Sequence, residues 1–269
     1  KIQHTIFVPA VILFLIQHPD SASTDFSSLE TVIYGASPIT DDTLLKAMEL
    51  MDCNFWQVYG LTETNGAITF LYPEDHDVSR GKLRSCGKAA LGVGLRVVDS
   101  EDNDVPVGEV GEVIIKSDLN MKGYWNRPEA TAEAIKDGWF YSGDVGYFDD
   151  EGFLYIHDRV KDMIVSGGEN IYPAEVENAL LSHPNISDAA VIGIPDEKWG
   201  EATKAFIVQL EGEKLSEDEV ISYVRTQIAG YKCPKTVDHI NELPRNPSGK
   251  ILRKDLRAPF WEGKDRNVS

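Results

Sequence analysis

Four short stretches of this 269-residue chain combine charged side chains with glycine or proline turns. They are Tyr59–Thr64, Tyr141–Asp144, Asp158–Pro173 and Asn246–Lys250. An ionised carboxylate such as that of Asp144 accepts hydrogen bonds from hydroxyl groups, and a lysine on a turn, such as Lys250, is a compact charge that can reach a phosphate. Taken singly, each stretch also fits an ordinary role: a turn capped by Thr62, a Gly-Asp turn, a charged connector and a solvated lysine.

The common nucleotide-binding fingerprints do not occur. Gly92-Val93-Gly94 lacks the third glycine of a dinucleotide loop, and Ser248-Gly249-Lys250 is followed by Ile251 where a P-loop has Ser or Thr. The net charge of −18, from 26 basic and 44 acidic side chains, repels nucleic acid and phosphates. We therefore expect no nucleic-acid binding, and a phosphate site must be built locally from a lysine, backbone N–H groups or a bound cation.

The composition is typical of a soluble globular protein, with 42% hydrophobic and 26% charged residues. Three separated cysteines, Cys53, Cys86 and Cys233, show no zinc-site spacing, which indicates reduced thiols and predicts a cytoplasmic location. The apolar run at residues 8–16 is too short to span a bilayer, so we expect a buried helix and no transmembrane segment. The chain opens on Lys1 just before apolar residues, which suggests a preceding portion; a homodimer is left open.

Residues 1–75 read as part of an α/β layer structure. Strand patterns at residues 29–34 and 54–58 flank a helix pattern at 41–52 that Thr40 or Asp41 can cap. The loops at 35–37 and 59–64 would then follow strands that can be neighbours, and ligands bind beyond the carboxyl ends of such strands.

From about residue 76 the pattern changes to short strands separated by Gly, Pro and Asp turns, which predicts a small β-barrel or twisted sheet up to residue 160. Tyr124-Trp125-Asn126-Arg127-Pro128 and a helix near residues 129–135 interrupt it. Residues 158–173 read as a junction whose charges keep it solvated and whose Gly167 and Gly168 relax the backbone. Residues 161–269 then alternate helices and strands, which predicts a small, mobile α+β domain.

The four stretches, in this order and at these separations, strongly resemble the adenylate-forming superfamily, and within it acyl-CoA synthetases, most of all those for fatty acids. The resemblance covers essentially the whole chain. One departure is important: the family's Ser/Thr/Gly-rich phosphate loop should stand well over a hundred residues upstream, so the chain resembles the carboxyl-terminal half of such an enzyme. The rest of the enzyme would then be its partner.

The resemblance implies a site for ATP and Mg²⁺. It assigns the adenine contact to Tyr59 and to the small residues Gly35, Ala36 and Ser37, the ribose to Asp144, and the ribose and phosphate to Arg159. Thr62 would offer a hydroxyl to a phosphate oxygen, Glu63 would bind magnesium, and Lys250 would be the catalytic lysine of adenylation. Such positive groups are needed because a carboxylate that attacks the α-phosphate brings two anions together.

The resemblance also implies a second half-reaction with coenzyme A. Gly167, Gly168, Glu169 and Trp199 match the lining of the tunnel for the pantetheine arm, although Trp199 is equally well explained as a core residue. Lys161 stands where the family has its hinge; many relatives carry aspartate there, so the lysine is a mild departure.

The expected function is an acid–thiol ligase that forms acyl-AMP from a carboxylic acid and ATP and then transfers the acyl group to CoA. Small residues around Gly35 and Gly66 favour a medium- or long-chain fatty acid. Three alternatives stay open: an aryl acid of the cinnamate type, an adenylating enzyme with another acceptor, and a non-catalytic fragment or binding module. The chain alone is expected to be inactive.

Overall fold

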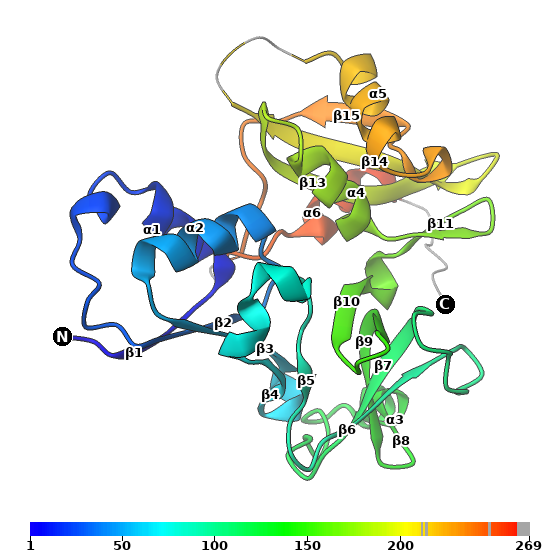
Figure 1. The fold of residues 1–269 in the computed structure, drawn as a ribbon. Helices are drawn as coiled ribbons and strands as arrows, with labels where there is room; N and C mark the ends of the chain where they lie inside the picture. Colours follow the sequence, from blue (N-terminus) through cyan, green and yellow to red (C-terminus); the bar gives the residue numbers. More distant parts are fainter. Residues whose placement is uncertain (211, 213–214, 247–248, 263–269) are drawn as a thin grey trace. The chain divides into compact units, whose positions relative to one another are not determined.

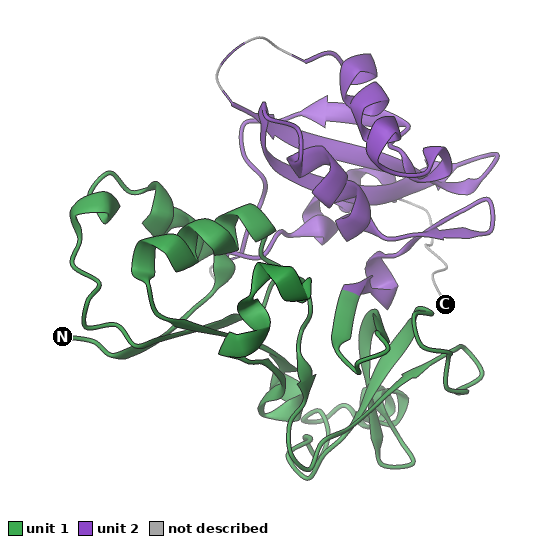
Figure 2. Cartoon of the chain, viewed as in Figure 1, with its two compact units in different colours: residues 1–156 green, residues 157–269 purple. Residues whose placement is uncertain are grey.

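The structure is a computed structural model that describes residues 1–210, 212, 215–246 and 249–262. The chain divides into two compact units, Lys1–Ile156 and His157–Ser269, as coloured in Figure 2. The sequence places the domain boundary slightly later, between residues 160 and 161. Among the described residues, no helix combines the length and the apolar character needed to cross a membrane.

The first sheet of unit 1 has five strands in the order β1-β2-β3-β4-β5 (Figure 1). These are β1 (His4–Phe7), β2 (Thr31–Gly35), β3 (Asn54–Leu61), β4 (Gly66–Leu71) and β5 (Lys88–Ala89). The first three run parallel, and β4 and β5 continue the sheet antiparallel. The predicted α/β layer is therefore confirmed, and β2 and β3 are the neighbours that the sequence suggests.

Two helices, α1 (Pro9–Gln17) and α2 (Asp41–Met51), connect the parallel strands and lie on one face of the sheet (Figure 1). The Thr40 side chain caps α2 by accepting the N–H of Thr43, as expected. The shared core buries apolar side chains from both helices and from β2 and β3: Ile12, Val32, Tyr34, Leu44, Ala47, Met51 and Phe55. The helix α1 is only partly buried, because Phe14 stays 67% exposed.

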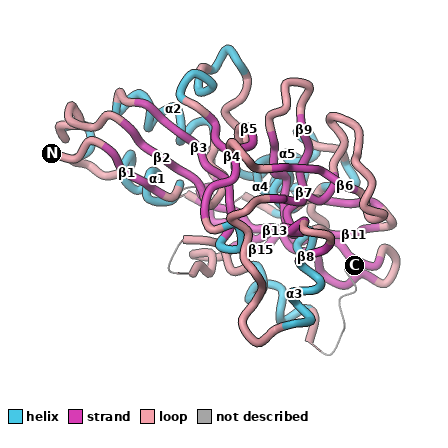
Figure 3. The backbone as a smooth tube through the Cα atoms, turned by 90° about the horizontal axis from the view of Figure 1, so that it is seen from below, coloured by secondary structure: helices cyan, strands magenta, loops and turns pink. Residues whose placement is uncertain are grey.

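The second sheet of unit 1 follows the strand order β10-β9-β7-β6. Its strands are β6 (Gly94–Val98), β7 (Gly111–Lys116), β9 (Trp139–Phe148) and β10 (Leu154–Arg159), with β8 (Ile135–Lys136) beside β9. The short helix α3 (Pro128–Ala134) leads into β8, as Figure 3 shows. Among the described residues this is an open sheet and not a closed barrel, since β6 and β10 are its two ends.

Unit 2 contains a five-stranded sheet covered by helices. Its strands are β11 (Ile164–Ser166), β12 (Glu169–Ile171), β13 (Ile186–Asp196), β14 (Gly200–Gln209) and β15 (Thr236–His239). Its helices are α4 (Pro173–Leu181), α5 (Glu217–Gln227) and α6 (Arg253–Arg257). The pattern confirms the predicted α+β domain.

Both faces of β13 are buried. Ala189 and Val191 belong to the core that α4 and α5 cover, whereas Ala190 and Ile192 face a smaller cluster that includes Leu256 of α6. Because side chains alternate along a strand, one continuous apolar run supplies both layers.

Candidate active site

The end of β2 is shaped by close contact with β3. Gly35 pairs with Val58, and a Cβ atom at residue 35 would lie 2.2 Å from the Val58 carbonyl oxygen. The close approach of β3 therefore requires glycine at residue 35. In the sequence, this small residue instead suggests the approach of the adenine base. Ala36 follows with a left-handed φ of 69° and is exposed, and Ser37 is half-buried. Their contact with adenine stays a prediction.

Tyr59 and Asp144 lie together although 85 residues separate them in sequence. The Tyr59 hydroxyl, from β3, donates a 2.6 Å hydrogen bond to Oδ2 of Asp144, from β9. Asp144 is only 5% exposed. Burial, followed by the charge of Asp144, raises the pKa of Tyr59 well above its usual value, so the phenol is a donor throughout the physiological pH range.

Asp144 is presented by an irregular segment inside β9. Ser142, Gly143 and Asp144 together oppose Val113 of β7, because the register shifts between Glu112 and Ile114. Gly143 has a φ of 68°, which favours glycine. The predicted alternative, a tight Gly-Asp turn between strands, is wrong: the pair forms a bulge within a strand.

Glu112 supports this bulge, and the sequence did not single it out. Its Oε1 accepts the N–H of Gly143 at 2.9 Å, while the Ser142 hydroxyl donates to the Val113 carbonyl at 2.6 Å and accepts the N–H of Asp144 at 3.0 Å. Burial raises the pKa of Glu112. In the sequence, Glu112 reads as an ordinary residue of a strand, so nothing there indicates that it supports a bulge in the neighbouring strand.

The segment after Tyr59 closes as a 3₁₀ turn at Thr62–Thr64. Thr64, not Thr62, makes the recorded side-chain hydrogen bonds of this turn: Oγ1 of the buried Thr64 accepts the Leu61 N–H and lies within hydrogen-bond distance of both the Leu61 and the Gly66 carbonyl oxygens. The suggested capping role of Thr62 is therefore wrong. The Thr62 side chain is exposed, which leaves its hydroxyl accessible.

Glu63 is half-buried and is contacted by Tyr124, whose hydroxyl donates to Oε1 at 3.0 Å. Within the described ranges, no group of three His, Cys, Asp or Glu side chains could hold a metal ion. Magnesium, however, is commonly bound by one or two carboxylates together with substrate phosphates. Glu63 could therefore bind Mg²⁺ as a single protein carboxylate that acts together with the phosphates of a nucleotide.

In unit 2, Gly167 and Trp199 are in contact. A Cβ atom at Gly167 would lie 2.7 Å from Cε3 of the Trp199 ring, and the Gly167 N–H donates to the Trp199 carbonyl at 2.8 Å. At Gly168 the corresponding space is open. Trp199 is 43% exposed, so it is not a core residue. Glu169 is exposed at the start of β12.

The junction is less solvated than the sequence suggests. Asp158 is 7% exposed and accepts the N–H groups of Arg159 and Ala174, both at 2.8 Å. Asp162 is half-buried and pairs with Arg257 at 3.4 Å. The expectation of an unburied charged loop is thus wrong for these two carboxylates, because each finds donors within unit 2. Burial raises the pKa of Asp158 to about 6.

Lys161 and Arg159, at the start of the junction, are both exposed. Lys161 belongs to a 3₁₀ turn at Val160–Asp162, and its carbonyl accepts a 3.5 Å hydrogen bond from Nη1 of Arg257. The N–H of Met163 donates to the carbonyl of Val160 and closes the turn. A hinge at Lys161 stays a prediction.

Lys250 lies on a short reversal of the chain. The N–H of Lys250 donates to Oδ1 of Asn246 at 2.9 Å, and the Lys250 carbonyl accepts the N–H of Asn246 at 2.9 Å. Arg245 and Ile251 form an antiparallel β-bridge beside them. The Lys250 side chain is exposed, consistent with the predicted lysine at a turn. Pro247 and Ser248 of the same motif lie outside the described residues.

Comparison with known proteins places these residues in a family. The AMP-binding enzyme family matches residues 1–125, and the AMP-binding enzyme C-terminal domain matches residues 175–250. The chain belongs to the AMP-binding, adenylate-forming superfamily.

Relatives within the superfamily include enzymes with different acyl acceptors. A long-chain-fatty-acid–CoA ligase from Mycobacterium tuberculosis is 44% identical over 94% of this chain and 49% of its own length. A fatty acid–[acyl-carrier-protein] ligase from Streptomyces coeruleorubidus is 41% identical over 97% of this chain and 50% of its own length. This chain therefore spans about half the length of these relatives.

A solved structure of the same superfamily has the same fold. The crystal structure of ATP-bound MatB from Rhodopseudomonas palustris matches with a TM-score of 0.89 and 31% identity, covering 97% of this chain and 51% of that chain. The adenylate-forming fold is therefore present in this chain as mixed α/β sheets with the superfamily's C-terminal domain.

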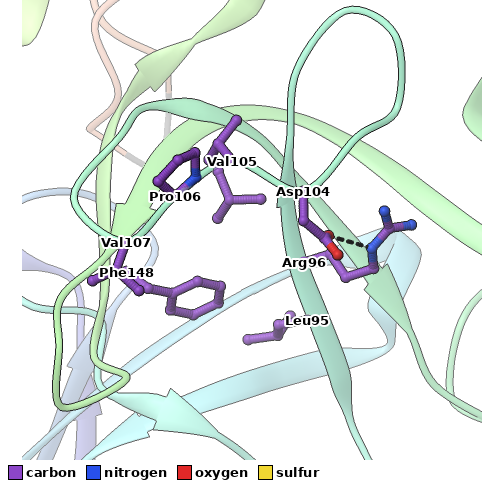
Figure 4. Close-up of a pocket in the computed structure, with 8 residues that line it drawn as sticks. Leu95, Arg96, Asp104, Val105, Pro106, Val107 and Phe148 are labelled. Atoms are coloured by element: carbon purple, nitrogen blue, oxygen red, sulfur yellow. Dashed lines mark hydrogen bonds and ion pairs between the residues drawn. The ribbon is translucent and has the colours of Figure 1, made fainter.

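A pocket in unit 1 lies apart from all predicted site residues of this AMP-binding chain. Its lining is mostly apolar and comes from β6, the turn that follows it, and β9: Leu95, Arg96, Val97, Asp104, Val105, Pro106, Val107 and Phe148 (Figure 4). Its one ion pair joins Arg96 to Asp104 at 2.6 Å. None of the catalytic or nucleotide candidates lines it.

Proposed function

We propose that this chain is the carboxyl-terminal part of an ATP-dependent acid–thiol ligase. In the first half-reaction, a carboxylic acid attacks the α-phosphorus of ATP, which forms acyl-AMP and releases pyrophosphate. In the second, the thiol of CoA attacks the acyl carbonyl and AMP leaves. The observation that carries the proposal is the hydrogen bond between Tyr59 and Asp144, because it unites two separate motifs at one buried position.

In unit 1 we assign the nucleotide to the residues around this pair. Asp144, as an ionised acceptor, would bind the ribose hydroxyls, and the Tyr59 ring, whose hydroxyl is already engaged, would offer its face to adenine beside residues 35–37. The exposed Thr62 hydroxyl would bind a phosphate oxygen. Magnesium, bound through Glu63 and the phosphates, would offset their negative charge.

In unit 2 we assign residues to successive steps. Lys250 would stabilise the charge that develops at the α-phosphate, and Arg159 would contact ribose and phosphate. The open space beside Gly168 and the exposed Trp199 ring would border the path of the pantetheine arm of CoA. Because the two steps need different groups of one unit at one adenylate, a hinge at Lys161 would turn that unit between them.

We propose a medium- or long-chain fatty acid as the substrate. Two relatives above 40% identity are named for fatty acids, which supports this class. Their acceptors differ, however, and the Streptomyces relative is named for a carrier protein. A carrier-protein thiol is therefore the second candidate acceptor.

The test is pyrophosphate release by the full-length protein that contains this chain, across fatty and aryl acids, with and without CoA. We expect fatty acids to give the fastest release and CoA to increase turnover. Faster release with cinnamates would show that the substrate is an aryl acid and not a fatty acid. Product formation only with a carrier protein would replace the acceptor, and no acid-dependent release would refute the ligase.

A further inference from the structure

Residues 117–127 contact Glu63 through two hydrogen bonds. The N–H of Met121 donates to the Glu63 main-chain carbonyl at 2.7 Å, and the hydroxyl of Tyr124 donates to the side-chain Oε1 at 3.0 Å. The first bond fixes the backbone of Glu63 and the second fixes its carboxylate. Residues 61 positions apart are thereby held at one place in unit 1.

Tyr124 is itself held by the start of α3. Its N–H donates to Oγ1 of Thr131 at 2.9 Å, and the Thr131 hydroxyl donates to the Arg127 carbonyl at 2.8 Å. Gly123 has a φ of 151°, and a Cβ atom there would lie 2.6 Å from Cγ2 of Thr131. The glycine thus allows the main chain to pass against Thr131, so Tyr124 leaves the loop in a defined direction.

A second tie joins the same loop to the sheet. The Asn120 side chain donates from Nδ2 to the Ile115 carbonyl of β7 at 3.0 Å. The loop is therefore bound to β7 before Met121 and to α3 after Tyr124. Because these bonds restrain the main chain around Tyr124, little further main-chain freedom is lost when its hydroxyl bonds to Glu63.

The two oxygens of the Glu63 carboxylate differ. Oε1 accepts the Tyr124 hydroxyl, whereas Oε2 has no recorded hydrogen bond or ion pair to any of the residues that the structure describes. One held oxygen and one open oxygen suit a carboxylate that gives a cation a single ligand atom.

We propose that Tyr124 is a positioning residue that holds Oε1 of Glu63 so that Oε2 remains available to the Mg²⁺ of the bound nucleotide. This inference rests on the proposed ligase function. It adds a residue that acts through Glu63 and touches neither the nucleotide nor the reacting atoms. Its effect should appear in the magnesium dependence of ATP binding, because the adenine and ribose contacts do not depend on Tyr124.

The experiment is calorimetric ATP binding to the full-length ligase at a series of Mg²⁺ concentrations. Tyr124→Phe removes only the hydroxyl and should raise the Mg²⁺ concentration for half-maximal binding about threefold to tenfold, in the range of a hydrogen bond to a charged group. ATP affinity at saturating Mg²⁺ should change less. Tyr155→Phe is the matched control, since Tyr155 donates to the carboxylate of Asp149 at 3.3 Å elsewhere in unit 1.

A double-mutant cycle with Glu63→Ala identifies the route of the effect. If Tyr124 acts through Glu63, adding Tyr124→Phe to Glu63→Ala should cause no further change. An equal additional change would overturn the proposal, as would a magnesium dependence of Tyr124→Phe that equals that of Tyr155→Phe. Failure of the wild-type protein to bind Mg²⁺-ATP at all would instead refute the proposed ligase, and this inference with it.

Discussion

The hydroxyl of Tyr59 donates a 2.6 Å hydrogen bond to Oδ2 of Asp144, and the aspartate is almost completely buried. A buried carboxylate needs such donors, because charge that is removed from water without a partner is costly. The bond therefore fixes both groups: the tyrosine ring is held at the end of the β3 strand, and the aspartate presents a defined orientation. In the proposed site, one bound nucleotide would contact both the Tyr59 ring and the Asp144 carboxylate.

The first prediction follows from this pair. Tyr59→Phe keeps the ring but removes one donor from Asp144, so ATP should bind about tenfold more weakly, the size expected for a charge-assisted hydrogen bond. Equilibrium binding of ATP to the full-length protein measures this. Tyr223→Phe is the control, since its hydroxyl bonds to the Ser182 carbonyl in unit 2 at 2.9 Å. Equal ATP affinity of Tyr59→Phe and Tyr223→Phe would show that the Tyr59 hydroxyl does not contribute to the nucleotide site.

The second prediction separates the half-reactions. If Lys250 stabilises charge at the α-phosphate, Lys250→Ala in the full-length protein should slow adenylation about a hundredfold to a thousandfold. Conversion of added acyl-adenylate to thioester should survive. Lys254→Ala, a nearby lysine in α6, is the control. An equal loss in both half-reactions would mean that Lys250 has a structural role.

The third prediction concerns the hinge. Lys161→Pro fixes φ near −65° and removes an N–H, whereas Lys161→Ala changes only the side chain. If the fixed angle suits the adenylating arrangement, Lys161→Pro should keep pyrophosphate release and lose thioester formation from isolated adenylate, and Lys161→Ala should keep both. Nearly normal thioester formation by folded Lys161→Pro would return residues 158–162 to the role of a connector.

The fourth prediction is a pH dependence of stability. Burial raises the pKa of Asp158 from 3.8 to about 6, so the folded state binds this proton more tightly than the unfolded state does. The resulting stabilisation is full below pH 3.8 and is lost as the pH rises through 6. The free energy of unfolding of wild type minus that of Asp158→Asn should therefore fall by about 2 kcal/mol between pH 4 and pH 7.

Urea unfolding of the 269-residue chain at several pH values checks this difference. Asp255→Asn serves as the control, because Asp255 is an exposed aspartate of α6. A difference between wild type and Asp158→Asn that does not change with pH, or that grows as the pH rises, would show that the Asp158 carboxylate is better solvated or better paired than its burial implies.

Local patterns were enough to predict most elements. The helix α2 follows from the apolar spacing of Leu44, Met48 and Met51 behind the Thr40 cap, and β2 and β3 follow from short β-rich runs. These signals are local because helix and strand periodicity is set by neighbouring residues. The α+β character of unit 2 could be predicted for the same reason, but the order of its strands could not, because strand pairing joins residues far apart in the sequence.

Contacts between distant residues could not be predicted in this way. Asp158 looked solvated because its sequence neighbours are charged, but its acceptor groups are satisfied by the N–H of Ala174 at the start of α4. Glu112 looked like an ordinary strand residue until the bulge at Gly143 placed an N–H before it. Tyr124 likewise meets Glu63 only after the loop has folded back.

The most direct measurement of the central claim is detection of acyl-AMP by mass spectrometry. The full-length protein is incubated with ATP, Mg²⁺ and a long-chain fatty acid without CoA, and CoA is then added. The proposed function predicts that acyl-AMP accumulates on the protein and is converted to acyl-CoA with release of AMP. Release of ADP and phosphate in place of AMP and pyrophosphate, or the absence of any acid-dependent adenylate, would contradict it.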